Sequence, residues 1–234
     1  MASQSYAKNE VWAIVPAKRF SEAKARLAPV LTRPERAQLA RVMLQDVMTV
    51  LSSVKEFSGI LVVSGDPLVA EVVRPFGARL VHDGLEAGVN EAVRQGLSAL
   101  TADRIAGAVI VPGDVPFVTL VEAQTILHAM KERRIVLAPA LRDSGTNCLA
   151  MADSRAIEPC FGEGSFIAHQ AAARRAGIEC GVCHLDGLGH DIDCPDDLVG
   201  CLRWPGSRTA RLLEELNVAA RMDGSVPQSL GIQI

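Results

Sequence analysis

The sequence has no long apolar run, no strong charge imbalance and no apolar segment near its first residue. No uninterrupted apolar stretch approaches the roughly 18 residues that a membrane-spanning helix needs. The formal net charge is -3 over 234 residues, so bulk charge favours neither a nucleic-acid partner nor a membrane surface. Residues 1–9 are polar and lack the apolar core of a secretory signal. We therefore expect a cytoplasmic protein without nucleic-acid or membrane partners.

Two common phosphate-binding signatures are also missing. The chain contains neither Gly-x-x-x-x-Gly-Lys-Ser/Thr nor Gly-x-Gly-x-x-Gly. Their absence disfavours a P-loop ATPase and a dinucleotide-binding protein of the usual kind. A nucleotide, if one binds, must be held by other groups.

Six cysteines are present, and in a cytoplasmic protein they are expected to be free thiols. Cys180 and Cys183, followed by His184, have the spacing of zinc ligands and of a haem attachment site. Haem attachment needs export, for which there is no signal. The flanking Ile178 and Leu185 favour a buried strand, in which the two cysteines point to opposite faces. We therefore expect no zinc site here.

Short apolar segments alternate with segments of helical periodicity. Strands are expected at Val11–Val15, Ile60–Ser64, Ala78–His82, Ala108–Val111, Ile135–Ala138, Cys148–Met151 and Ile178–Leu185. Helices are expected at Pro34–Ser53, Pro67–Phe76, Val89–Leu100, Leu120–Arg133, Ser165–Ala176 and Pro195–Leu202. The alternation predicts a single-domain α/β fold, with a mostly parallel sheet and helices on both of its faces. This domain is expected to span residues 1–204, and a polar, partly helical tail to occupy residues 205–234.

The most informative segment is Val109–Phe117, an apolar run interrupted by Pro112, Gly113 and Asp114. It predicts a buried strand that ends in a tight turn and holds Asp114 at the carboxyl end of the sheet, where open α/β sheets bind ligands. A carboxylate there suits a divalent metal, and such metals commonly act on phosphates. The alternative is that Asp114 only makes the turn or caps the next helix.

The segment that follows the first expected strand is basic. Between Lys18 and Arg41 the chain carries seven basic and two acidic residues, a local charge of +5 in a protein of net charge -3. A cluster of cations at this place suits a chain of phosphates. The alternative is a solvated basic face, but Lys18 follows the strand directly and we favour a functional role for it.

Two further turns have the composition of ligand-binding loops. Gly88 permits close approach of the backbone, and Asn90 can cap the following helix or bind a ligand. Gly162 and Gly164 precede Ser165, which is placed as a helix N-cap. Such a helix start, with N–H groups pointing outward, can bind a carboxylate or a phosphate, although a plain capped helix is equally compatible with the sequence.

Carboxylates also gather near residue 190. Asp191 and Asp193 alternate, so in a strand they would face the same side. Together with Asp114 they could hold one or two Mg²⁺ ions. Asp196 and Asp197 are better explained by the favourable position of acidic residues in the first turn of a helix.

Taken together, these motifs resemble those of the CofC/FbiD family of phospholactate-type guanylyltransferases. The matching segments are Val-Pro-x-Lys at 15–18, Ala23-Lys24-x-Arg26-Leu27-Ala28, Gly88-x-Asn90, Pro112-Gly113-Asp114-x-Pro116, Gly145-Thr146-Asn147, Phe161-Gly162-x-Gly164-Ser165-Phe166 with His169, and Asp191-Ile192-Asp193-x-Pro195-x-Asp197-Leu198. They run in the family's order from residue 11 to about residue 200. The chain departs from the pattern at Cys194 and Phe117, where Thr and Leu are usual.

The resemblance implies a Rossmann-like nucleotide-diphospho-sugar transferase fold. It also implies transfer of GMP from GTP to a small phosphorylated carboxylic acid, with release of pyrophosphate, in the biosynthesis of coenzyme F-420. Different members use 2-phospho-L-lactate, phosphoenolpyruvate or 3-phospho-D-glycerate. GTP and one such acid are therefore the expected partners, Mg²⁺ is the expected cofactor, and a homodimer is compatible with the resemblance.

The resemblance also assigns roles to individual residues. Catalysis is expected from Asp114, Lys18 and Lys24, and Mg²⁺ binding from Asp114, Asp193 and Asp191. The acid is expected at Thr146, Gly162 and Ser165. The nucleotide is expected at Pro16, Lys18, Lys24, Arg26, Ser64, Gly88, Asn90, Pro112 and Gly113. His169 is given no role beyond packing.

Other functions remain open at this point. Asp-x-Asp followed by Pro-x-Asp also occurs in sugar-nucleotide glycosyltransferases, which share this sheet but usually carry the metal-binding Asp-x-Asp at the mid-chain strand. A non-catalytic nucleotide-binding relative is expected to have lost carboxylates that this chain keeps. A molybdenum-cofactor-type or sugar-phosphate nucleotidyltransferase is a further alternative, because spacing alone does not identify the base.

Overall fold

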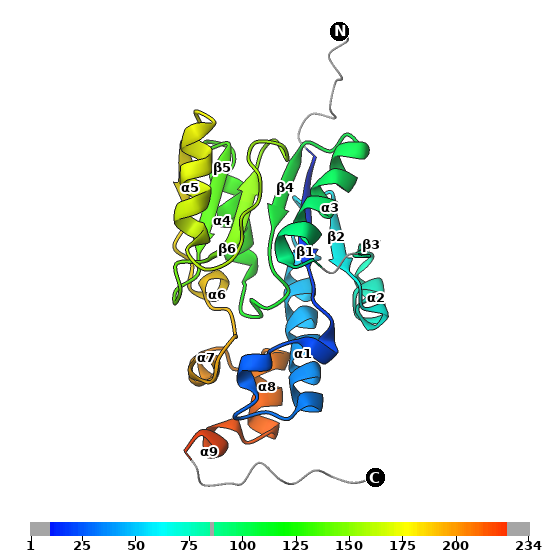
Figure 1. Ribbon diagram of the computed structural model, residues 1–234, viewed down its shortest axis with the longest axis vertical. Helices are drawn as coiled ribbons and strands as arrows, with labels where there is room; N and C mark the ends of the chain where they lie inside the picture. Colours follow the sequence, from blue (N-terminus) through cyan, green and yellow to red (C-terminus); the bar gives the residue numbers. More distant parts are fainter. Residues whose placement is uncertain (1–9, 85–86, 224–234) are drawn as a thin grey trace.

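The protein is described by a computed structural model that covers residues 10–84 and 87–223 (Figure 1). Its strands are β1 (Val11–Pro16), β2 (Gly59–Ser64), β3 (Arg79–His82), β4 (Gly107–Ile110), β5 (Ile135–Pro139), β6 (Thr146–Met151) and β7 (Cys180–Val182). Its α-helices are α1 (Arg33–Leu51), α2 (Pro67–Val73), α3 (Val89–Ala102), α4 (Leu120–Ala129), α5 (Ser165–Arg175), α6 (Asp186–Gly189), α7 (Pro195–Gly200), α8 (Arg208–Glu215) and α9 (Val218–Met222). None of these described helices is long and apolar enough to cross a membrane.

The described strands form one seven-stranded sheet in the order β3-β2-β1-β4-β6-β5-β7. Strand β6 runs antiparallel to both of its neighbours, and the other pairs are parallel. The prediction of a mostly parallel sheet is therefore confirmed. Because β1 lies between β2 and β4, the strand order changes direction there, and a crevice is expected at the carboxyl ends of β1 and β4.

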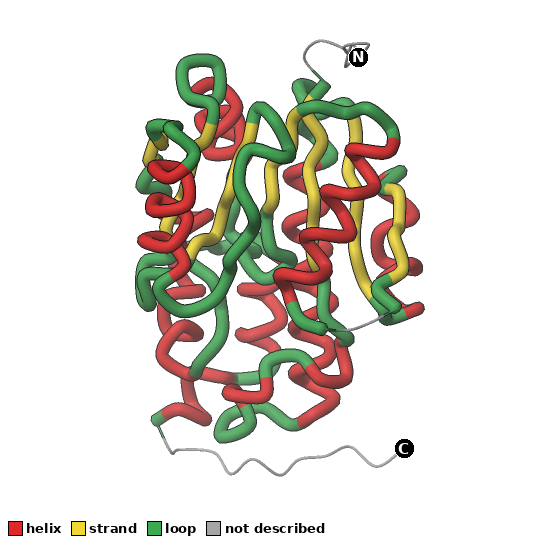
Figure 2. Tube along the Cα trace, turned by 45° about the horizontal axis from the view of Figure 1, so that its top comes forward, coloured by secondary structure: helices red, strands yellow, loops and turns green. Residues whose placement is uncertain are grey.

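Helices cover both faces of the sheet, as predicted (Figures 1 and 2). Alternate residues of β1 show the two layers, since Ala13 and Val15 pack in one apolar cluster and Ile14 in the other. The first cluster includes buried residues of α1, α2 and α4, and the second those of α3 and α5. In Figure 1, α3 and α5 lie in front of the sheet and α4 lies behind it.

The last described helices pack against α1 at the end of the molecule opposite residue 10 (Figure 1). Asp46, buried in α1, accepts hydrogen bonds from the backbone N–H groups of Arg208 (3.2 Å) and Thr209 (2.8 Å) at the start of α8. Arg221 of α9 pairs with Glu35 of α1 at 2.9 Å. These contacts anchor α8 and α9 to the body of the domain.

The last strand is shorter than predicted. Residues 178–185 were expected to be extended, but β7 comprises only Cys180–Val182. At the start of the expected strand, the Ile178 N–H bonds to the Ala173 carbonyl and closes the end of α5. At its other end, α6 begins at Asp186. Asp191 and Asp193 lie in a loop between α6 and α7, so their shared face does not come from the alternation of a strand.

The two cysteines of the Cys-x-x-Cys motif lie on opposite sides of the sheet. Cys180 packs against the cluster under α3 and α5, and Cys183 against the other cluster. We predict that the purified protein carries no stoichiometric zinc, because ligands on opposite faces cannot share one ion. Elemental analysis tests this. About one zinc per chain that disappears in Cys183→Ser would contradict the prediction.

Candidate active site

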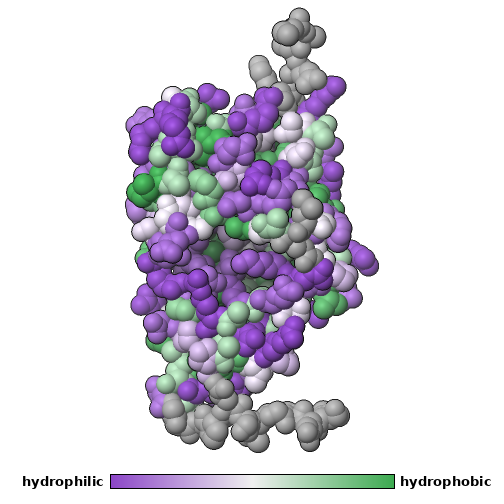
Figure 3. Space-filling view, in the orientation of Figure 1, coloured by the Kyte–Doolittle hydropathy of each residue, from purple (hydrophilic) through white to green (hydrophobic). Residues whose placement is uncertain are grey.

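A cavity of about 660 Å³ opens at the carboxyl ends of β1 and β4, where the strand order changes direction. In Figure 3 a recess near the middle of the face shown is bordered largely by hydrophilic residues. The residues predicted from the sequence that line the cavity are Pro16, Lys18, Lys24, Arg26, Gly88, Pro112, Gly113, Asp114, Thr146, Gly162, Asp191 and Asp193. Most of the predicted site residues are thus brought together at one place.

Lys24 is at the centre of the charged part of this cavity. Its Nζ lies 2.7 Å from Asp114 Oδ2 and 2.7 Å from Asp193 Oδ1. The Lys24 side chain is only 6% exposed, whereas the two carboxylates are 36% and 37% exposed. The sequence had assigned this lysine to the triphosphate, but in the structure it bridges the two carboxylates predicted to bind metal.

Local backbone geometry places Lys24 there. The residue lies between two short 3-10 helices, η1 (Phe20–Glu22) and η2 (Ala25–Leu27), with φ 56° and ψ 39°. A non-glycine residue in this left-handed region is uncommon and costs of order 1 kcal/mol. The loop is held from the other side by Asp66, which accepts the Phe20 N–H at 2.9 Å. The contacts around Lys24 therefore stabilise a backbone conformation that the residue does not prefer.

The pairing changes the proton affinity of the groups involved. Burial lowers the pKa of Lys24, but the charges of Asp114 and Asp193 raise it more, and the pKa lies above its usual value. Burial raises the pKa of Asp193, but Lys24, and with it Lys18 and Arg26, lowers it more. The lysine is therefore an ammonium and Asp193 a carboxylate at neutral pH.

Asp191 is placed differently from Asp193. Its Oδ1 accepts a hydrogen bond from Asn147 Nδ2 at 3.1 Å, and it makes no ion pair with Lys24. Burial, with added repulsion from Asp114 and Asp193, raises the pKa of Asp191 despite the Asn147 hydrogen bond. Asp114 and Asp193 thus form the carboxylate pair, and Asp191 lies beside it.

Asp197 fixes the loop that carries Asp193. Its Oδ2 accepts the backbone N–H groups of Asp193 (2.8 Å) and Cys194 (2.7 Å), and its Oδ1 pairs with Arg142 Nε at 3.2 Å. Asp197 is 7% exposed, so these bonds are shielded from water. The predicted role at a helix start is present, but the carboxylate also ties the loop that carries Asp193 to Arg142.

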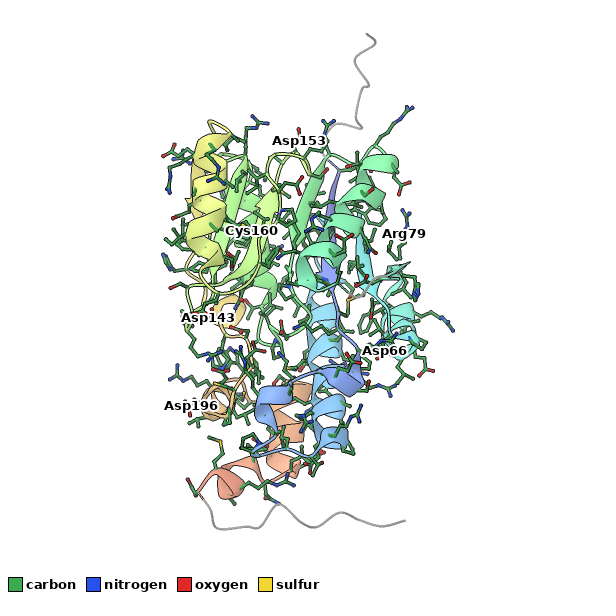
Figure 4. The ribbon with its side chains drawn as sticks, in the orientation of Figure 1. Asp66, Arg79, Asp143, Asp153, Cys160 and Asp196 are labelled. Atoms are coloured by element: carbon green, nitrogen blue, oxygen red, sulfur yellow. The ribbon has the colours of Figure 1, made fainter. Side chains whose placement is uncertain are left out.

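Arg142 is a cavity residue that sequence reasoning missed. It lies in the loop between β5 and β6, near Asp143, which Figure 4 labels. The only signal for it was a basic residue shortly before the polar Ser144–Asn147 turn. It supplies positive charge to the part of the cavity wall that the β5–β6 loop forms.

Three predicted residues do not line the cavity. Ser64 is 1% exposed, and its hydroxyl accepts the Asp66 N–H at 3.1 Å. The Asn90 side chain makes two hydrogen bonds to the backbone of Phe161: it donates to the carbonyl at 2.9 Å and accepts from the N–H at 2.6 Å. Ser165 is buried, and its hydroxyl donates to Thr146 Oγ1 at 3.1 Å. The side chains of all three support neighbouring loops rather than form the wall.

The glycine-rich turn before α5 differs in detail from expectation. The N-cap of α5 is Gly164 with φ 68°, and Ser165 is the first helical residue, because this cap requires a left-handed backbone. The Ser165 N–H bonds to the Gly162 carbonyl at 3.1 Å, so it is not presented outward. Within the described chain, the N–H groups of Gly162 and Glu163 have no hydrogen-bond partner, and both residues line the cavity. These N–H groups can receive an anion.

The chain is similar to proteins of known family. Residues 11–227 match the family described as "Guanylyl transferase CofC like". A phosphoenolpyruvate guanylyltransferase of Sphaerobacter thermophilus is 39% identical over 80% of this chain and 89% of its own length. A 3-phospho-D-glycerate guanylyltransferase of Phenylobacterium zucineum is 34% identical over 83% and 91%. A 2-phospho-L-lactate guanylyltransferase of Methanothermobacter thermautotrophicus is 32% identical over 80% and 81%.

Solved structures share the fold at low sequence identity. A protein of Desulfovibrio desulfuricans G20, assigned as a nucleotide-diphospho-sugar transferase, superposes with a TM-score of 0.72 at 16% identity over 93% of this chain and 98% of its own. The 4-diphosphocytidyl-2C-methyl-D-erythritol synthase of Anaerococcus prevotii superposes with a TM-score of 0.57 at 13% identity over 82% and 94%. The expected fold is thereby confirmed.

Proposed function

This chain belongs to the CofC-like guanylyl transferase family, and from that membership we propose that it transfers GMP from GTP to the phosphate of a small phosphorylated carboxylic acid, releasing pyrophosphate. The candidate acids are phosphoenolpyruvate, 3-phospho-D-glycerate and 2-phospho-L-lactate, the acids named for its relatives. The proposed product is an intermediate of coenzyme F-420 biosynthesis. The observation that carries the proposal is the pairing of Asp114 and Asp193 around a single cation at the crevice between β1 and β4.

The proposed reaction requires little acid–base catalysis from the protein. The second pKa of a phosphate monoester is about 6, so the attacking oxygen is largely deprotonated at pH 7. The barrier lies mainly in bringing two anions together and holding them in line, which cations and fixed dipoles lower. A cavity lined by Lys18, Lys24, Arg26 and Arg142, with no cysteine and no histidine among its lining residues, fits that requirement.

The carboxylate pair also fits Mg²⁺. Asp114 and Asp193 direct one oxygen each at the same point, which Lys24 Nζ occupies. Mg²⁺ in phosphoryl-transfer sites is typically held by one or two carboxylates together with substrate phosphates and water, so two protein ligands suffice. When bound, the ion would neutralise charge on the reacting phosphates. Lys24 would then leave the carboxylates and be available to the triphosphate, the role that the resemblance implies.

The cavity offers separate places for the two anionic substrates. Lys18 and Arg26 follow β1, and we assign them to the triphosphate. Arg142, Thr146 and the N–H group of Gly162 lie on the β6 and α5 side, and we assign them to the acid. This division gives each substrate its own hydrogen-bonding and cationic groups, and an in-line transfer would then place the attacking acid phosphate and the leaving pyrophosphate on opposite sides of the α-phosphorus.

Thr146→Val tests the acid side of the cavity. The change preserves shape but removes the hydroxyl, so we expect the KM for the acid to rise by roughly tenfold, the effect of losing about 1.4 kcal/mol in a hydrogen bond to a charged group. Ser165→Ala should act in the same direction through Thr146. The KM for GTP should change little. Paired titrations of acid and GTP measure both, and a rise confined to GTP would contradict the assignment.

The proposed activity is tested directly by incubating the protein with Mg²⁺, each of the four common NTPs and each of the three acids, and following pyrophosphate. We expect release with GTP and at least one acid. Release with a sugar phosphate, or from a molybdopterin substrate, in place of all three acids would move the protein to another nucleotidyltransferase activity. Transfer of sugar from a sugar nucleotide would make it a glycosyltransferase.

A further inference from the structure

His169, which the sequence predicts only to pack, lies in a chain of buried polar contacts behind the acid side of the cavity. It is the fifth residue of α5 and is 0% exposed. Its Nε2 accepts the backbone N–H of Cys160 at 3.0 Å, and its Nδ1 lies 3.0 Å from Thr146 Oγ1. Cys160, labelled in Figure 4, lies beside α5. Both ring nitrogens are therefore engaged.

These contacts determine which ring nitrogen carries the proton. A backbone N–H can only donate, so Nε2 must be an acceptor and carry no hydrogen. Burial lowers the pKa of His169 to about 4, although the Ser165 carbonyl, hydrogen-bonded to the ring, opposes the shift. The ring is thus neutral at pH 7, and its single hydrogen is on Nδ1. This hydrogen can be shared between Thr146 Oγ1 and the Ser165 carbonyl, and because Nδ1 carries it, Nδ1 cannot accept the Thr146 hydrogen.

The hydrogen bond in turn orients the Thr146 hydroxyl. Oγ1 accepts from His169 Nδ1–H and from the Ser165 hydroxyl at 3.1 Å. A hydroxyl has two acceptor sites and one hydrogen. With both acceptor sites used, the Thr146 hydrogen can only be donated to a third group. Thr146 lines the cavity, so the group that can receive it there is a ligand.

We propose that His169 is a positioning residue for the phosphorylated acid, because its Nδ1–H holds the Thr146 hydroxyl as a hydrogen-bond donor to an anionic group of that substrate. The inference rests on the proposed function, which supplies the acid. A hydroxyl free to rotate would present its lone pairs to the anion part of the time. A donor fixed in advance avoids that reorganisation when the anion binds.

Two substitutions separate the two ring nitrogens. In His169→Asn, the side-chain amide nitrogen takes the place of Nδ1 and can still donate to Thr146, but the acceptor for the Cys160 N–H is lost. In His169→Gln, the amide oxygen takes the place of Nε2 and can accept the Cys160 N–H, but the donor to Thr146 is lost. Each variant removes one buried hydrogen bond, so each controls for the general loss of stability in the other.

We expect His169→Gln to raise the KM for the acid about fivefold to tenfold without changing the KM for GTP, and His169→Asn to leave both near the wild-type values. In a Thr146→Val background, His169→Gln should have no further effect on the KM for the acid, because the two residues act through one hydroxyl. Equal effects of the two variants, or a shift in the KM for GTP, would mean that His169 only supports the fold and would overturn the inference.

A second measurement needs neither substrate nor turnover. The ¹⁵N chemical shifts of His169 in the free wild-type protein, labelled at its histidine ring nitrogens, report which nitrogen is protonated. We expect the neutral Nδ1–H form from pH 5.5 to pH 8. The Nε2–H form or an imidazolium at pH 7 would overturn the inference even if the protein is an active guanylyltransferase. Conversely, a wild-type protein that uses none of the three acids would overturn the proposed function whatever the tautomer.

Discussion

Asp114→Asn is expected to lower the turnover number at least ~100-fold, the scale of losing a major electrostatic group in an active site. The substitution scarcely changes the volume of the side chain, and Asp114 is about one-third exposed, so the fold should survive. It removes the charge that faces Lys24 and that would hold Mg²⁺ against the phosphates. Pyrophosphate release at saturating GTP and acid measures the effect, and thermal unfolding checks the fold.

Asp196→Asn is the matched control for this prediction. Asp196 is an exposed carboxylate in α7, close in sequence to Asp193 but not part of the cavity wall (Figure 4). The same chemical change there should leave the turnover number within about twofold of wild type, since surface charges outside a site contribute little. Near-normal activity of Asp114→Asn with Mg²⁺ would exclude Asp114 as a metal ligand.

Lys24→Met is expected to produce two opposite effects. The turnover number should fall by roughly 100-fold, because the cation that we propose reaches the triphosphate once Mg²⁺ takes its place is lost. The affinity of the free protein for Mg²⁺ should rise, because the ion no longer has to displace an ammonium that lies 2.7 Å from each of the two carboxylates proposed to bind it. Methionine keeps the unbranched stem of lysine, so packing around the buried side chain is largely preserved. Isothermal titration of the protein with Mg²⁺ measures the second effect.

Lys18→Met controls for the loss of a positive charge near the cavity. Lys18 is exposed and makes no ion pair with a carboxylate in the described part of the chain. We expect weaker GTP binding in this variant and no increase in Mg²⁺ affinity beyond what the change in net charge produces. If Lys24→Met binds Mg²⁺ more weakly than wild type, the metal is not sharing the position of the lysine, and the proposed placement of Mg²⁺ is wrong.

Much of the fold follows from local features of the sequence. The apolar runs predict all the strands because buried parallel strands need them, and the helical periodicity predicts the helices that cover them. The turn at Pro112 and Gly113 places Asp114 at the carboxyl end of the sheet, as expected. These features depend on neighbours within a few residues, which is why a sequence can show them.

The predicted element boundaries were wrong where the neighbouring elements of a segment, rather than its own composition, determine its conformation. Residues around β7 are apolar enough for a longer strand, but the end of α5 and the start of α6 use their backbone groups. Ser165 has the chemistry of an N-cap, but the bend before α5 needs a positive φ that Gly164 adopts more readily. In both places competition between neighbouring elements decided the boundary.

By itself, the sequence determined the α/β architecture and the family, and most of the site residues it predicted do meet in the cavity. The tertiary structure alone decided how those residues pair. Lys24 reaches Asp114 and Asp193 across 90 and 169 residues of chain, and Asn90 holds Phe161 across 71. Such contacts form because loops from distant strands meet at one edge of the sheet, and no local pattern encodes which loops these are. The proton on His169 Nδ1 is likewise set by burial and by the N–H of Cys160, which only the folded chain brings together.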